Sequence, residues 1–440
     1  MRSLKLFVIF LLTTTGIFAQ DEEALLLSGP MVGYSEMREV LLWVQTNGPA
    51  QVQFEYSAGE GAKIAYRTEI YQTRLSEAYT ARLIADQVKP GQIYSYKLLI
   101  NGKEVARPYA MTFQTPPLWQ WRTDPPEFSF AVGSCSYIND EPYDRPGTPY
   151  GGDYRIFESI HRKNPDLMIW LGDNTYLREA DWYTNTGIIH RYTHTRNVAE
   201  LQPLLASTAH YATWDDHDYG PNDSDHTFRD KNLTYRAFQL FWGNPSYGIE
   251  NQGGVTSTFE WGDAQFFLLD DRYFRDPNDK KTEKRSILGE TQLRWFMDAI
   301  ISSTAKIKFV CIGGQMINTS GESETYSAIA PEEREYILNT IASEGIKNVI
   351  FLTGDRHHAE FSVYEKYGVK IYDFTTSPLT AGIHNNPKEA NTLRVPGSYF
   401  GQRNFAMVEI TGQRLARKVK LSLFDTDGKP LWSTEIEILN

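Results

Sequence analysis

Apolar runs that end in carboxylate and imidazole side chains most constrain how this chain can fold. Residues 349–352 are Val-Ile-Phe-Leu, and after Thr-Gly they lead into Asp355, His357 and His358. A short apolar run that stops at such residues is typical of a buried strand that ends at a functional site. The pattern occurs twice more upstream: residues 166–171 lead into Gly172-Asp173-Asn174-Thr175-Tyr176, and residues 211–214 lead into Asp215-Asp216-His217-Asp218.

These strand ends predict a metal centre. In an open α/β sheet, the carboxyl ends of the strands meet at one crevice, so residues that are distant in the sequence can lie together there. Converging carboxylates repel one another, and a divalent or trivalent cation removes that conflict.

Each candidate residue also has a structural interpretation. Aspartate is a common turn and cap residue. Cys135 fits a packed core thiol, Tyr176 is one of 26 tyrosines, and His217 could simply bond Asp216 or Asp218. The occurrence of several such endings in one region favours the metal centre.

The N-terminal part of the chain has a different pattern from the rest. Residues 24–117 contain short alternating strands separated by Pro90-Gly91 and Asn101-Gly102, which indicates an antiparallel β-sandwich. This region resembles fibronectin type III-like modules, and we expect an architectural role in preference to sugar or surface binding. Residues 118–126 are rich in proline and form the predicted linker.

Strands alternate with helices in residues 127–440, which indicates an α/β domain with much of its sheet buried. Residues 382–401 are predicted to form a long loop that borders the active site. The expected strands are 127–135, 166–173, 209–215, 255–261, 264–271, 306–314, 348–355 and 369–377, and the expected helices are 153–163, 235–243, 290–303 and 331–344.

The first residues predict export. Arg2 and Lys5 precede the apolar run 6–12, and small or polar residues lead to Ala19, so residues 1–20 are interpreted as a secretory signal peptide. A membrane anchor is the weaker alternative, because a spanning helix needs about 20 apolar residues. We expect a periplasmic or extracellular bacterial protein without a transmembrane segment. The oligomeric state is left open.

The net charge and the cysteine content exclude further classes of function and fold. The formal net charge of −11 becomes −13 once the two basic residues of the signal peptide are removed, which argues against a nucleic-acid-binding surface. An anionic substrate would then need local cations or metal. Cys135 and Cys311 are the only cysteines, so there is no disulfide framework, although one bridge between them stays open.

Five motifs, in this order along residues 127–410, resemble the PhoD-type alkaline phosphatases, a branch of the calcineurin-like metallophosphatases. The usual opening Asp-x-His of the superfamily is absent and Cys135 stands there, as in PhoD enzymes. Tyr176 replaces the last aspartate of the second motif, and Gln315 stands where an isolated ligand histidine is customary. The motifs are Gly133-Ser134-Cys135, residues 172–176, 214–222 and 269–275, and Gly354-Asp355-Arg356-His357.

The resemblance implies a four-layer αββα sandwich that holds a dinuclear or multinuclear centre of iron with calcium; zinc or manganese are the alternatives. Thiolate and phenolate ligands suit a ferric ion, and oxygen-rich surroundings suit calcium. The expected metal ligands are Cys135, Asp173, Tyr176, Asp216, Asp355 and His357.

The implied reaction is hydrolysis of phosphomonoesters, phosphodiesters or both by a hydroxide held on the metal. His217 would protonate or stabilise the leaving oxygen. Arg272, Asn222 and His358 are expected to bind substrate, although a salt bridge of Arg272 to Asp270 or Asp276 is an equal alternative. The competing functions are a dedicated phosphodiesterase or phospholipase D-like enzyme, and an inactive surface-binding protein.

Overall fold

The computed structural model describes residues 25–59, 64–281, 283–322 and 324–439. The predicted signal peptide, residues 1–20, lies outside them. None of the described helices combines the length and the apolar character needed to cross a membrane.

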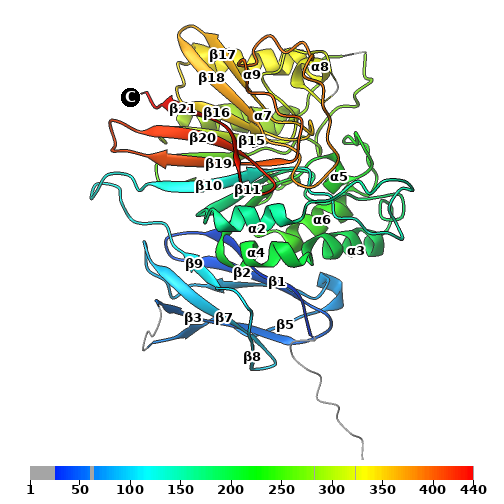
Figure 1. The fold of residues 1–440 in the computed structure, drawn as a ribbon, viewed down its shortest axis with the longest axis vertical. Helices are drawn as coiled ribbons and strands as arrows, with labels where there is room; N and C mark the ends of the chain where they lie inside the picture. The colour runs from blue at the N-terminus through cyan, green and yellow to red at the C-terminus, as the bar shows by residue number, and fades with distance from the viewer. Residues whose placement is uncertain (1–24, 60–63, 282, 323, 440) are drawn as a thin grey trace, which may run out of the picture.

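Two large sheets form the centre of the molecule (Figure 1). The first has nine strands in the order β21-β20-β19-β10-β11-β12-β1-β2-β6. β10, β11 and β12 are parallel neighbours, and the C-terminal strands continue the sheet beyond β10 in antiparallel order. The bounds are β1 (Leu26–Ser35), β2 (Val40–Thr46), β6 (Thr80–Ala85), β10 (Phe128–Gly133), β11 (Leu167–Leu171), β12 (Ala209–Thr213), β19 (Asn404–Thr411), β20 (Lys418–Asp425) and β21 (Pro430–Glu437).

The second sheet has six strands in the order β13-β14-β15-β16-β18-β17. Its inner strands are mostly apolar, and every residue of β15 and β16 is buried. The bounds are β13 (Ser257–Trp261), β14 (Ala264–Leu268), β15 (Ile307–Ile312), β16 (Val349–Thr353), β17 (Glu360–Lys366) and β18 (Val369–Thr375).

Helices cover the outer faces of both sheets. The first sheet packs against α2 (Arg155–Arg162), α3 (Asn185–Arg196), α4 (Gln202–Ser207) and α6 (Lys231–Phe241). The second packs against α7 (Gly289–Ser302), α8 (Tyr326–Ile329) and α9 (Pro331–Ser343). The short helix α5 (Asp216–Tyr219) follows β12. The layers are therefore helices, sheet, sheet and helices, as the resemblance implied.

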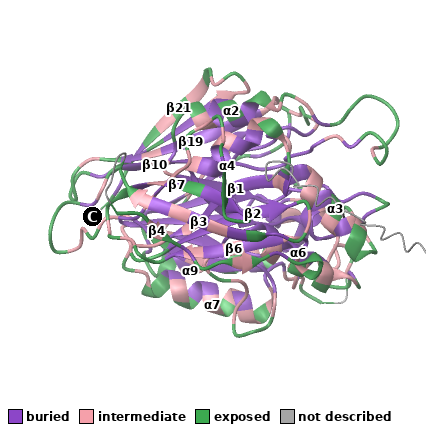
Figure 2. Cartoon of the chain, turned by 90° about the horizontal axis from the view of Figure 1, so that it is seen from below, coloured by how far each residue is buried: buried purple, intermediate pink, exposed green. Residues whose placement is uncertain are grey.

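The core between the sheets is aromatic. The ring of Phe130 in β10 packs edge to face on Phe266 and Phe309 of the second sheet, with centroids 5.2 and 5.0 Å apart. Figure 2 shows the strands mostly buried, while α3 and α7 also carry exposed surface. This packing sets the distance between the ends of the two sheets.

The N-terminal region is built mainly of β-strands, as predicted, but these strands do not form an isolated unit. β1, β2 and β6 extend the nine-stranded sheet, where Val32 of β1 pairs with Ala209 of β12. Likeness to fibronectin type III modules stays a prediction. The other N-terminal strands form a sheet of their own: β3 (Gln51–Ala58), β4 (Tyr66–Arg67), β5 (Tyr71–Gln72), β7 (Ile93–Ile100), β8 (Lys103–Val105) and β9 (Thr112–Gln114).

The eight strands and four helices expected in residues 127–377 all appear, with shifts of a few residues at their ends. β17 was not anticipated, because it begins directly after the histidine-rich turn without a glycine or proline to mark its start. Cys135 and Cys311 are both buried free thiols, so the structure contains no bridge between them.

Candidate metal centre

Four strands carry the predicted ligands to one end of the packed sheets. Cys135 follows β10, Asp173 follows β11 and Asp216 follows β12, which are neighbouring parallel strands of the first sheet. Asp355 follows β16 of the second sheet. Because the two sheets pack face to face around a shared core, their strand ends meet at a single crevice.

The backbone turns sharply at this crevice. Cys135, Asp173, Asp355 and His357 all have positive φ angles, of 57°, 51°, 61° and 54°. This left-handed conformation is uncommon for residues other than glycine and costs about 1 kcal/mol or more at each position. Asp355 and His357 therefore reach the site through a turn after β16 ends, and not by alternation along a strand.

Glycines allow the chain segments to approach closely. A Cβ atom on Gly172, whose φ is 95°, would lie 2.6 Å from Cβ of Asp215. A Cβ on Gly313 would lie 2.4 Å from Oδ2 of Asp215 and 2.5 Å from Oδ2 of Asp271. No larger residue fits at either strand end unless these carboxylates move.

One group of possible ligands combines a thiol, a carboxylate and an imidazole. Donor atoms of Cys135, Asp173 and His357 all lie within 4.8 Å of one another. The Cys135 Sγ is 3.7 Å from Oδ2 of Asp173, and the Tyr176 hydroxyl is 3.2 Å from Nε2 of His357. The other ring nitrogen of His357, Nδ1, lies 2.5 Å from the Gly382 carbonyl oxygen, which fixes the orientation of the ring.

Two further groups adjoin the first and share residues with each other. Asp173, Asp216 and His217 form one, and Asp215, Asp216 and Asp355 form the other. Asp173 belongs to the first two groups and Asp216 to the last two, so these carboxylates occupy the positions that could bridge neighbouring cations. Oδ2 of Asp215 is buried and has no hydrogen-bond partner within the described part of the chain.

Burial and mutual repulsion disfavour the charged forms of these acids. Burial is the main cause that raises the pKa of Asp173 well above its ordinary value, and the charges of Asp216 and Asp355 raise it further. The pKa of Asp355 is also raised well above its ordinary value, by burial and then by Glu324 and Asp216. The Cys135 thiol has a raised pKa from burial and from the nearby Asp173 and Asp355. A cation at this position would relieve all three effects.

His217 lies between the ligand groups. Its backbone N–H donates to Oδ1 of Asp173 at 3.2 Å and to Oδ1 of Asp216 at 2.9 Å. Its ring packs against that of Tyr176 in a tilted arrangement with centroids 4.3 Å apart, and its buried Nδ1 has no hydrogen-bond partner among the described residues. Burial lowers the pKa of His217 to about 4, so the ring is neutral at neutral pH.

A cavity of about 410 Å³ opens over this cluster. Of the predicted residues, Asp173, Asp216, His217, Asn222, Asp355 and His357 line it. Cys135 and Tyr176 lie behind them, with only 0% and 2% of their surface exposed. The lining is completed by Tyr150, Asp223, Glu322, Glu324, Arg356, Gly382, Ile383 and His384.

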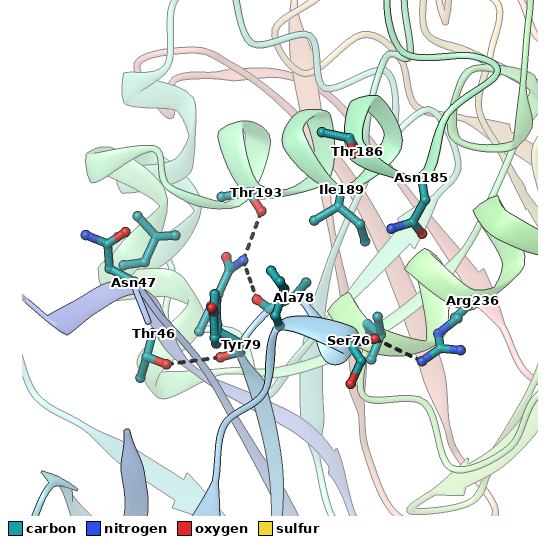
Figure 3. Close-up of a pocket in the computed structure, with 14 residues that line it drawn as sticks. Thr46, Asn47, Ser76, Ala78, Tyr79, Asn185, Thr186, Ile189, Thr193 and Arg236 are labelled. Carbon is teal, nitrogen blue, oxygen red and sulfur yellow. Dashed lines mark hydrogen bonds between the residues drawn. The ribbon is translucent and has the colours of Figure 1, made fainter. Parts of the chain in front are cut away.

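A second large cavity, of about 490 Å³, lies elsewhere (Figure 3). It is bounded by α3, α6 and the N-terminal turn at Ser76, Ala78 and Tyr79, and Arg236 donates a hydrogen bond to the Ser76 carbonyl across it. None of the predicted ligands lines this cavity, and its described lining contains no acidic side chain.

Arg272 was expected to bind substrate, but its side chain bonds other residues of the protein. Its side chain is fully buried and bonds Asp215 through Nε and Glu324 through Nη2, the latter at 2.9 Å. These partners are neither Asp270 nor Asp276, the alternatives considered from the sequence. The guanidinium thus compensates acidic residues next to the site, and we do not assign it to substrate.

His358 also lies away from the cavity. It is fully buried, its ring packs against Tyr399 with centroids 4.9 Å apart, and neither ring nitrogen has a hydrogen-bond partner among the residues that the structure describes. His357 lines the cavity and His358 does not. We therefore do not assign His358 to substrate either.

Several residues of the site were not predicted. Asp215 could have been predicted from the sequence, since it belongs to the acidic run after β12. Glu324 and Tyr150 could not, because they lie in polar loops without a recognisable sequence pattern. Burial raises the pKa of Glu324, but the guanidinium groups of Arg275 and Arg272 outweigh it and hold that pKa below its ordinary value.

We expect the chelator-treated protein to lose stability as pH rises from 6.5 to 8. Burial raises the pKa of Asp218 to about 8, and the pKa values of Asp173 and Asp355 are raised too, so the folded state retains protons that the unfolded state has already released. The free energy of unfolding then falls with pH, by at most about 1.4 kcal/mol per pH unit for each carboxyl group. His217 and His357 act in the opposite direction, but only between about pH 4 and 6.5. Thermal unfolding measures the trend, and a midpoint that rises between pH 6.5 and 8 would contradict it.

Comparisons with known proteins show the family and the fold of this chain. Residues 130–414 match the family model described as PhoD-like phosphatase, and residues 23–118 match one described as a domain of unknown function. Alkaline phosphatase D of Bacillus subtilis (strain 168) is 25% identical over 402 residues, which is 78% of this chain and 65% of that protein, slightly under two thirds of its length.

Two solved structures have the same fold. A structure of PhoD superposes with a TM-score of 0.76 at 18% identity, covering 94% of this chain and 93% of the other. A purple acid phosphatase from yellow lupin (Lupinus luteus) seeds superposes with a TM-score of 0.69 at 12% identity, covering 93% of this chain and 74% of the other. The match to the family model extends over more than half of the chain, which therefore belongs to the PhoD-like phosphatase family.

Proposed function

We propose that this protein is an exported, metal-dependent phosphohydrolase that cleaves phosphomonoesters, phosphodiesters or both. The main support is the set of three overlapping ligand groups that meet at one cavity in a chain of the PhoD-like family. Membership of the family favours phosphate esters as the substrate class. The charge balance of −11 supports a role for metal in holding such anions.

The donor set fits cations of two kinds. Cys135, Asp173, Tyr176 and His357 would hold one cation, and thiolate with phenolate favours iron there. Asp216 and Asp355, with Asn222 at the cavity wall, would supply the oxygen ligands that calcium prefers. The raised pKa values of Asp173 and Asp355 support the fit, because these acids are poorly compensated by protein groups alone. Zinc or manganese at the same donors is the alternative.

Bound cations would supply Lewis acidity that activates water and stabilises charge on the phosphoryl oxygens. The protein's own part begins with His217, which lines the cavity beside Asp173 and Asp216. Since its ring is neutral at neutral pH, it would stabilise the leaving oxygen by donating a hydrogen bond, without a stored positive charge. The hydrogen bonds from its backbone to both aspartates hold it in place.

Arg356 and Asn222 are better placed to contact substrate than Arg272 and His358. Both line the cavity. Arg356 is held by Oε1 of Gln315 at 2.7 Å and by Oε2 of Glu389 at 2.8 Å, so its position is fixed before any ligand arrives. Asn222 is exposed and can bind either a cation or a phosphate oxygen.

Removal of metal tests the proposal directly. We expect elemental analysis to find iron with calcium in the purified protein, and a chelator to abolish hydrolysis of para-nitrophenyl phosphate and bis-para-nitrophenyl phosphate. The ratio of the two rates before chelation decides whether the enzyme is foremost a monoesterase or a diesterase. Return of activity when metal is added back shows that the protein has stayed folded.

A folded, metal-free protein that hydrolyses neither ester would contradict the proposal and favour the surface-binding alternative. A diester rate far above the monoester rate would be consistent with phosphohydrolase activity and would favour the dedicated phosphodiesterase. Asp173→Asn, which removes a shared carboxylate charge, should be inactive, whereas Asp86→Asn, at an exposed N-terminal position, should match the wild type.

Cys135→Ser is expected to deplete iron while calcium is retained. The thiol lies in the group with Asp173 and His357, whereas the group of Asp215, Asp216 and Asp355 does not include it. The substitution is nearly isosteric, and we expect a change in unfolding free energy of about 1 kcal/mol or less. Metal content per protein chain is the readout, and full iron content in the variant would refute the assignment of Cys135.

Export rests on the sequence of residues 1–20. If they are a signal peptide, the protein recovered from the periplasm or medium should begin at Asp21 or close to it. Intact mass measurement of the exported protein gives its first residue. Recovery of full-length chain only, in the cytoplasm, would contradict export.

A further inference from the structure

Arg178 is a buried cation next to the metal cavity, and the proposed chemistry does not use it. It follows Tyr176 in the loop after β11, and only 6% of its surface is exposed. Its guanidinium lies over three tyrosine rings, 4.6 Å from the centroid of Tyr137, 5.3 Å from that of Tyr176 and 5.9 Å from that of Tyr150. Aromatic faces can hold a guanidinium in this way without occupying its hydrogen-bond donors.

Most donors of Arg178 are left available. Nε donates to the Tyr137 hydroxyl at 3.2 Å. Among the described residues, neither Nη has a hydrogen-bond acceptor, and no carboxylate forms an ion pair with this guanidinium. Arg417, by contrast, is also buried but pairs with Asp263 at 2.6 Å, as is usual for a charge removed from water.

A side pocket of about 220 Å³ lies in front of Arg178. Tyr150, His217 and Asn222 line both this pocket and the metal cavity, so the two spaces share a wall. Arg145 and Asp144 also line the side pocket. A ligand whose phosphorus lies in the metal cavity could therefore extend past His217 toward Arg178.

The other charged groups of the side pocket are already engaged. Arg145 is exposed and pairs with Glu179 at 2.7 Å. Asp144 accepts a hydrogen bond from the Tyr137 hydroxyl at 2.6 Å and another from the Asp140 N–H at 2.9 Å. Arg178 is thus the one charged group there, within the described chain, that is buried and still has free donors.

We infer that the side pocket binds a second oxyanion, a phosphate or a carboxylate, on the leaving group of the substrate. The two free Nη groups form a planar fork, and such a fork recognises the paired oxygens of an oxyanion. This inference rests on the proposed function, because it assumes that the scissile phosphorus lies in the metal cavity. It makes Arg178 a specificity residue for esters with a charged leaving group.

Three synthetic monoesters test the inference: the monophosphate of propane-1,3-diol, its 1,3-bisphosphate, and 3-phosphooxypropanoate. They share a three-carbon leaving group that is neutral, phosphorylated or carboxylated. For the metal-loaded wild type we expect the highest kcat/KM with one of the two esters whose leaving group is charged. That ester identifies the preferred oxyanion.

Arg178→Gln should lower kcat/KM for the preferred charged ester by about 10- to 100-fold, as expected for the loss of a charge-assisted hydrogen bond. The loss for the neutral ester should be clearly smaller, and Arg178→Lys should fall between the two. Arg162→Gln, which removes an exposed arginine of α2, is the matched control and should behave like the wild type on all three esters. Metal content and circular dichroism are measured for each variant.

Equal losses on all three esters, or no loss on any, would overturn the inference. If the metal-loaded wild type hydrolyses none of them, and neither para-nitrophenyl phosphate nor bis-para-nitrophenyl phosphate, the proposed function fails instead. The side pocket is then tested by the thermal shift that the bisphosphate produces: a shift in the wild type that is absent in Arg178→Gln supports the pocket, and equal shifts, or none, overturn it.

Discussion

The concentration of acidic groups where two buried sheets end is the constraint on which the rest of this structure depends. Asp173, Asp215, Asp216 and Asp355 follow three strands and lie within one small region, where all but the partly exposed Asp355 are buried. Burial and repulsion raise the pKa of Asp173 and Asp355, so the bare protein holds them poorly as anions. Bound cations would stabilise such an arrangement, which is why the geometry favours a metal centre over a structural cluster.

The fold holds the strand ends and the donor residues rigidly in position. The phenylalanine packing between the sheets fixes the separation of the strand ends, and left-handed turns at Cys135, Asp173, Asp355 and His357 place the donors where regular strands would not. Glycines at the strand ends leave room for the carboxylates of Asp215 and Asp271. These features cost conformational energy, and the surrounding packing compensates for it.

The arginines around the site have different roles. Arg272 and Arg275 bond Glu324 beside the acidic cluster and belong to the scaffold. Arg356 faces the cavity but is held by Glu389 and Gln315. Among the described arginines around the site, only Arg178 combines burial, contacts with aromatic rings and free donors on the far side of His217. An arginine whose donors already bond acceptors of the protein supports the site. An arginine whose donors are free can bind a ligand.

The sequence by itself determined the alternating α/β pattern and the strand ends at which Asp173, Asp216 and Asp355 occur, because apolar runs and their interruptions are local features. It could not separate Arg272 and His358 from residues that line the cavity, nor find Glu324, Tyr150 and Arg178. Their roles depend on which loops lie side by side and on which partner each side chain meets. Those contacts join segments far apart in the chain, and only the tertiary structure decides them.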